Sequence, residues 1–146
     1  MKLIKTKALA IAFSASVMAA PAMSAETIGT LTLELTGLKP TGTVHIALFD
    51  EADAFDSDGQ PVAGRKVSVD EATEIVTFEG LSPGTYGVKL LHDVNDNGKM
   101  DTNPFGMPIE PYAFSNNARG NFGPAKWDQA AFEITEAGTT QTLNVK

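Results

Sequence analysis

The chain has 146 residues, a formal net charge of −7 at pH 7 and no cysteine. An acidic protein repels a phosphate backbone, so nucleic acid is a poor partner. The lack of cysteine excludes disulfides, a cysteine nucleophile and a lipid-modified cysteine.

The first 25 residues have the composition of a secretory signal. Three lysines open it: Lys2, Lys5 and Lys7. The apolar run 9–20 is too short and too rich in small residues to span a membrane. The signal could be cleaved after Ala22 or after Ala25, and we favour Ala25. We predict that the remaining residues 26–146 form one β-sandwich domain without a transmembrane segment. This part holds 8 basic and 18 acidic residues, a net charge of −10, and we expect it in the periplasm or outside the cell.

Seven segments after the signal alternate apolar and polar side chains with the period of two that indicates half-buried strands. They are residues 26–35, 43–49, 66–70, 74–79, 85–91, 130–134 and 140–145. In the first of them, Leu31, Leu33 and Leu35 share one face. Because we find no convincing helical period, we predict an all-β fold, an antiparallel Greek-key β-sandwich of about seven strands.

The acidic stretch 50–64 is predicted to be a long surface loop. Its residues 56–59, Asp-Ser-Asp-Gly, are half of a cation-binding pattern, for which a solvated loop is the simpler explanation. His45, in the second predicted strand, points away from the apolar face. We expect it on the solvent side or between the sheets, not as a ligand.

A regular pattern of oxygen-bearing side chains follows the fifth predicted strand. Residues 93–101 match the first nine positions of an EF-hand calcium loop, in which positions 1, 3, 5, 7 and 9 supply ligands. The predicted ligands are Asp93, Asn95, Asn97, the backbone carbonyl of Lys99, and Asp101. Gly98 stands where such a loop turns sharply. The sequence therefore predicts calcium; magnesium prefers more waters, and zinc prefers Cys and His.

The pattern departs from an EF-hand at its last position. Position 12, which should be a bidentate Glu, is Pro104, and no helical pattern flanks the loop. We therefore expect a calcium loop on a β scaffold, with the last ligand supplied by Glu110, by Asp128 or by water. The alternative is a loop of Asx turns that satisfies its own backbone.

Residues 102–128 form a long segment rich in Gly, Pro and Asn. It holds five aromatic rings: Phe105, Tyr112, Phe114, Phe122 and Trp127. A loop this long in a compact domain is functional or internally packed, and we predict that the rings cover the core. In the alternative, the segment is a binding platform. Four side chains could then contact a glycan or a protein partner: Asn116, Asn117, Arg119 and Trp127.

Two resemblances follow from these motifs. The turn Leu-Ser-Pro-Gly-Thr-Tyr at residues 81–86 resembles that of transthyretin-like (prealbumin-like) β-sandwich domains. The pattern 92–103, with Gly-x-Pro-x-Glu at 106–110, Phe-Ser-Asn-Asn-Ala at 114–118 and Gly-Pro at 123–124, resembles a secreted bacterial family catalogued as domain of unknown function 2141. This second resemblance covers nearly all of residues 26–146, and it implies no established activity.

Two functions are compatible with these patterns. The first is an exported, non-enzymatic binding or structural domain that calcium stabilises. The second is a metal-assisted hydrolase that uses His92 beside Asp93. Transthyretin-like hydroxyisourate hydrolases end in Tyr-Arg-Gly-Ser, whereas this chain ends in Leu-Asn-Val-Lys and has no Gly-x-Ser-x-Gly motif. We therefore favour the first function.

Overall fold

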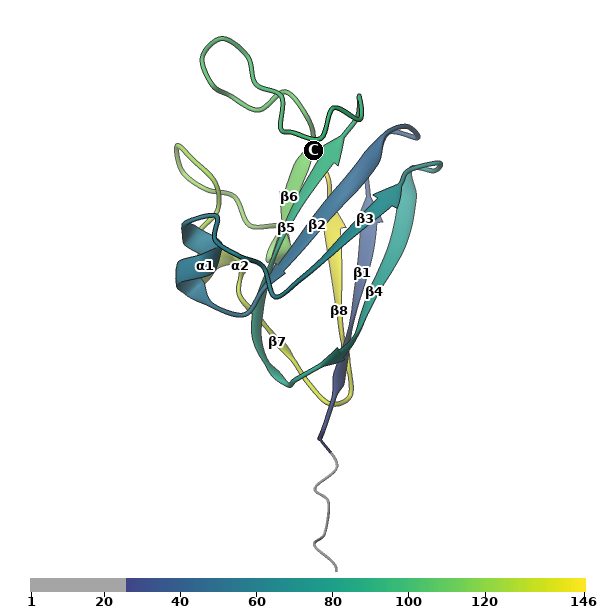
Figure 1. Cartoon of the computed structure of the whole chain (residues 1–146), viewed down its shortest axis with the longest axis vertical. Coiled ribbons are helices and arrows are strands. Elements are labelled where there is room, and N and C mark those ends of the chain that lie inside the picture. Colours follow the sequence, from purple (N-terminus) through teal and green to yellow (C-terminus); the bar gives the residue numbers. More distant parts are fainter. Residues whose placement is uncertain (1–25) are drawn as a thin grey trace, which may run out of the picture.

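Two β-sheets packed face to face make up the protein (Figure 1). The structure is a computed structural model that describes residues 26–146, so the predicted signal and its cleavage site lie outside the described residues. The smaller sheet has the order β4-β1-β8, from β1 (Gly29–Thr36), β4 (Thr73–Leu81) and β8 (Thr139–Asn144). The larger has the order β3-β2-β5-β6, from β2 (Thr43–Phe49), β3 (Ala63–Ser68), β5 (Gly84–Asp93) and β6 (Tyr112–Phe114). The predicted all-β sandwich is confirmed.

The last strands of the chain connect the two sheets. β7 (Phe132–Ile134) pairs antiparallel with the beginning of β5, along the edge that β6 occupies farther on. The chain then turns and enters the smaller sheet as β8, which runs parallel to β1. The other strand pairs are antiparallel. The parallel pair joins the first and last strands of the fold. Because these strands are far apart in the chain, no local sequence pattern predicts their pairing.

The main core lies between the sheets and follows the predicted alternation. Leu31, Leu33 and Leu35 of β1 are buried against the larger sheet. The larger sheet contributes Val44, Ile46, Leu48, Val88 and Leu90. Each fully buried leucine stabilises the fold by roughly 1.5–3 kcal/mol relative to an exposed one, so this core supplies most of the driving force for folding.

A second apolar cluster lies on the outer face of the larger sheet, under α1 (Ala52–Asp56) and α2 (Trp127–Ala130). Its centre is Phe55, which is fully buried and meets the rings of Phe49 and Trp127 edge-on at 5.5 and 5.7 Å. Gly87 of β5 lies beneath, and a Cβ there would come within 3.0 Å of the Phe55 ring. The stretch predicted as a surface loop thus contains a short helix, because Phe55 packs onto a bare patch of sheet.

The predicted aromatic cover over the core is only partly right. Phe114 is buried, and Tyr112 and Trp127 pack partly buried against the second cluster. Phe105 and Phe122 instead are 89 % and 111 % exposed. These two rings lie in loops that project from the sandwich (Figure 1), and the prediction that they cover the core is wrong.

Candidate cation-binding site

The candidate loop, residues 93–101, begins where β5 ends. Asp93 lies on the outer face of the larger sheet opposite Thr43, and only 1 % of it is exposed. Its two carboxylate oxygens accept the N–H groups of Asn97 at 3.1 Å and Gly98 at 2.7 Å. Gly98 has a φ of +80°, a conformation that glycine adopts without steric cost. The buried carboxylate therefore fixes the turn at its predicted glycine.

Three of the predicted ligand side chains meet at the mouth of this turn. The carboxylate of Asp101 accepts the amide N–H groups of Asn95 at 2.6 Å and of Asn97 at 2.8 Å. Hydrogen bonds from Asn97 and then Asn95, together with the charge of Lys99, lower the pKa of Asp101 below its usual value. The loop thus gathers hydrogen-bond donors around a carboxylate that stays ionised at neutral pH.

The same side chains also cap the backbone of the loop. The amide oxygen of Asn95 accepts the N–H of Asn97 at 3.2 Å, and that of Asn97 accepts the N–H of Lys99 at 3.0 Å. These are Asx turns, the arrangement expected of a loop that satisfies its own backbone. Capping and ion binding are compatible, because an amide oxygen has two lone pairs and a carboxylate about four acceptor sites.

Glu110 closes the loop from outside. It is 7 % exposed, and its two oxygens accept the N–H of Val94 at 2.9 Å and of Asp101 at 3.2 Å. One side chain thus ties together the two ends of the loop. The sequence left Glu110, Asp128 and water open as sources of the missing ligand. In the structure, Glu110 holds the backbone of the loop.

Asp128, the other carboxylate considered for the missing ligand, lies elsewhere. It belongs to α2, whose Trp127 packs over Gly87 in the first half of β5. Gly87 and Asp93 are separated by roughly 20 Å along the strand, at about 3.3 Å per residue. Asp128 therefore does not complete the site.

The residues of the loop that could bind a cation are mostly neutral oxygen donors. Nowhere in residues 26–146 do three or more His, Cys, Asp or Glu side chains gather as a metal site would require. Two carboxylates, two amides and the carbonyl of Lys99 remain as the ligand set. Oxygen donors of this kind are typical ligands of calcium and not of zinc.

The two histidines flank this site without joining it. His45 is partly exposed, with Nε2 3.7 Å from a carboxylate oxygen of Asp93. His92 points the other way, into the core, where Nε2 lies 2.8 Å from the carbonyl oxygen of Thr41. Within the described residues, its Nδ1 has no hydrogen-bond partner, and the side chain is fully buried. This position offers a hydrolase no accessible base.

The four side chains considered for partner binding have separate roles in the fold. The Asn117 amide donates to the carbonyl of Thr142 at 2.8 Å and accepts the N–H of Asn144 at 2.7 Å, as a neighbouring strand would. Asn116 likewise bonds to Ala131 and Gln141. Both asparagines have positive φ, 58° and 50°, which Asn tolerates better than most residues. Both asparagines are exposed, and their hydrogen bonds fasten the edge of β8.

The other two of these side chains differ from each other. Trp127 packs against Phe55 in the second cluster. Arg119 is exposed, with its guanidinium 5.7 Å from the centre of the Tyr112 ring. Of the four, Arg119 is the exposed residue whose side chain is not tied to the backbone of a neighbouring strand.

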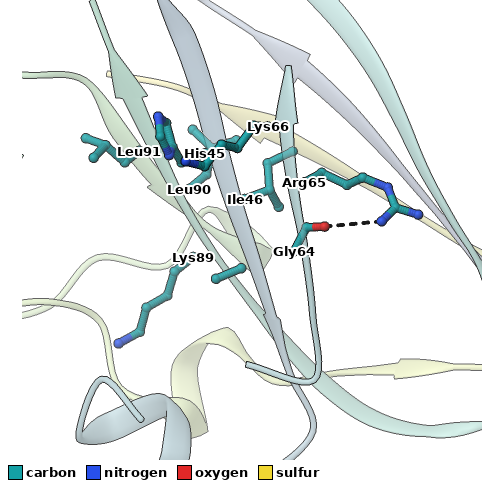
Figure 2. A pocket seen from close by; sticks show the side chains of 9 residues that line it. His45, Ile46, Gly64, Arg65, Lys66, Lys89, Leu90 and Leu91 are labelled. Atoms are coloured by element: carbon teal, nitrogen blue, oxygen red, sulfur yellow. Dashed lines mark hydrogen bonds between the residues drawn. The ribbon is translucent and has the colours of Figure 1, made fainter. Parts of the chain in front are cut away.

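An open groove crosses the outer face of the larger sheet beside the loop (Figure 2). Ala47 and Leu91 belong to its lining, and His45 and Lys66 stand at one end. Lys89 is held at the other end by Asp58 and lies over the Phe55 ring. Figure 2 shows Arg65 pointing away from Lys89; its guanidinium lies over the ring of Phe78, 5.0 Å from the centre.

Comparisons with known proteins identify one family. The model of DUF2141, described as an uncharacterized protein conserved in bacteria, matches residues 34–142. No curated protein and no solved structure matches the chain. Among residues 26–146, no helix is both long enough and apolar enough to cross a bilayer.

Proposed function

The chain belongs to the DUF2141 family of uncharacterized bacterial proteins. From its sequence and the geometry of its loop, we propose that it is an exported, non-enzymatic binding or structural domain whose loop 93–101 binds calcium. The main support is the meeting of three predicted ligand side chains, Asn95, Asn97 and Asp101, at one point of the loop. Export is supported by the signal-like composition of residues 1–25.

The contacts of Asp101 suggest how the loop keeps its conformation both without an ion and with one bound. Its carboxylate faces the NH₂ groups of both asparagines, and these donors provide part of the positive charge that a cation would supply. Rotation of an amide by half a turn exchanges its NH₂ group for its oxygen. Such a rotation would break the Asx turns to Asn97 and Lys99. We therefore propose that the two oxygens bind calcium through their second lone pairs while they still cap the backbone, without refolding of the loop.

The ligand set also sets the strength of binding. Without a bidentate glutamate, the site is expected in the range of about 10⁻⁴ to 10⁻³ M that is typical of extracellular modules. At a calcium concentration a hundred times the dissociation constant, mass action stabilises the fold by about 2.7 kcal/mol. At a few times that constant the gain is nearer 1 kcal/mol. Calcium is therefore proposed to stabilise the loop in the calcium-rich surroundings of an exported protein.

Thermal unfolding of the exported protein, with calcium and with chelator, tests the proposal. We expect a higher melting temperature in calcium and a measurable heat of calcium binding by calorimetry. Asp101→Asn keeps the shape of the side chain but removes its charge, and should abolish the calcium-dependent part of the shift. The control is Asp70→Ala, an exposed aspartate outside the loop, which should leave the shift intact.

The opposite result has a clear meaning. Equal melting temperatures with calcium and with chelator, and no heat of binding, would refute the calcium site. The loop would then be explained by its Asx turns alone, with the Glu110 clamp holding its ends.

A further inference from the structure

An apolar tip projects from the sandwich just beyond the candidate loop, in residues 103–109 (Figure 1). Phe105 is 89 % exposed, and Met107 and Ile109 are each 63 % exposed. An isolated bridge between Thr102 and Pro108 closes the tip into a narrow hairpin. Large apolar side chains gathered on one protruding loop are typical of a contact with a membrane or a partner.

The backbone N–H groups of this tip are satisfied from within. The side-chain oxygen of Asn103 accepts the N–H groups of Phe105 at 2.9 Å and Met107 at 3.1 Å. The N–H of Gly106 donates to the carbonyl of Asn103, and the N–H of Asn103 donates to the carbonyl of Met107. The N–H of Ile109 donates to the carbonyl of Asp101. Since residues 104 and 108 are prolines, every backbone N–H from 103 to 109 has an internal acceptor.

This internal pairing matters most in a lipid environment. A backbone N–H that leaves water without a partner costs several kcal/mol in hydrocarbon, so segments that enter a bilayer must satisfy their own donors. A protein partner, or water at its rim, would supply acceptors for open N–H groups, and no such pairing would be needed. The tip combines exposed apolar side chains with backbone N–H groups that need no acceptor from water.

Size and charge argue in the same direction. The three side chains expose roughly 400 Å² at most, about half of the ~800 Å² per partner of a standard protein interface. Self-association through this end would bring together the carboxylates of two copies, Asp96 and Asp101 of each, on chains that already carry net negative charge. The same charges disfavour an anionic lipid surface.

We propose that the tip formed by residues 103–109 inserts into the interface of a zwitterionic lipid bilayer, with Phe105 and Met107 as its anchors. This one loop would attach the domain to the membrane surface, and the two sheets would remain in water. The inference is independent of calcium, because the hairpin is built from its own hydrogen bonds.

Vesicle flotation in chelator tests this inference with the exported protein and phosphatidylcholine vesicles. We expect the protein to float with the vesicles, and Phe105→Ala to weaken binding at least about tenfold, as the loss of one buried phenylalanine implies. The matched control is Phe122→Ala, because Phe122 is also exposed but lies in a different loop. It should change binding less than twofold. Both variants should melt as the wild type does, since neither ring contributes to a core.

A second measurement reports insertion directly. Phe105→Trp should be quenched by bromine-labelled phosphatidylcholine, whereas the packed Trp127 of the wild-type protein should not. No flotation would overturn the inference, as would equal losses from Phe105→Ala and Phe122→Ala or a preference for anionic vesicles. Sedimentation that shows self-association abolished by Phe105→Ala, without vesicle binding, would assign the tip to a contact between copies instead.

Discussion

Replacement of Glu110 by glutamine gives a direct test of how the candidate loop is held. The glutamate oxygens accept the N–H of Val94 at 2.9 Å and of Asp101 at 3.2 Å. Glutamine keeps one acceptor but turns its NH₂ group toward the second N–H, so one charge-assisted hydrogen bond is lost. Such a bond contributes about 1.5–3 kcal/mol, and we expect a loss of about 2 kcal/mol in the free energy of unfolding.

Two assays measure this loss at different scales. For a domain of this size, the melting temperature in chelator should fall by roughly 6–10 °C. If the loss is confined to the loop, amide exchange at Val94 and Asp101 should instead accelerate about thirtyfold, since 1.4 kcal/mol is a factor of ten. Glu136→Gln, in the exposed turn between β7 and β8, is the control and should change stability by less than about 0.5 kcal/mol.

One result would refute the clamp. If Glu110→Gln melts like the wild-type protein in chelator and the two amides exchange at unchanged rates, the hydrogen bonds to Val94 and Asp101 do not hold the loop. If the same variant also binds calcium more weakly, Glu110 is a ligand, as the sequence alone allowed.

Two other predictions concern the edge of β8 and export. Asn117→Ala removes both bonds to β8 and places alanine at a φ of 50°, so we expect a loss of about 2–4 kcal/mol in urea denaturation. Asn117→Gly also removes the two bonds but tolerates the positive φ, so it should lose less free energy of unfolding than Asn117→Ala. An equal loss in both variants would show that backbone strain does not contribute. When the full chain is expressed in bacteria, the mass of the exported protein should correspond to loss of residues 1–25; an intact Met1 on the exported protein would refute cleavage.

The sequence by itself determined most of the strands and the faces they bury. It missed β6, which lies inside the segment 102–128 predicted as a loop, and it assigned Ala130 of α2 to a strand. The alternation in β1, β2 and β5 placed Leu31, Ile46 and Val88 inside, and the structure has them there. This succeeds because a period of two requires only neighbouring residues and one apolar side of a sheet. The turn at Gly98 could also be predicted from the sequence, because glycine adopts a positive φ without steric cost.

Only the tertiary structure decided the roles of the side chains outside this pattern. The short helix around Phe55 forms because the ring packs against Gly87, which lies 32 positions farther along the chain. Asn117 is exposed, as predicted, but its hydrogen bonds to β8 were not predicted, and neither was the burial of His92 in the core. Likewise Glu110, 16 positions from Val94, closes the loop from a separate segment. Each of these contacts joins residues far apart in sequence, and such pairings depend on how the sheets assemble, which no local periodicity encodes.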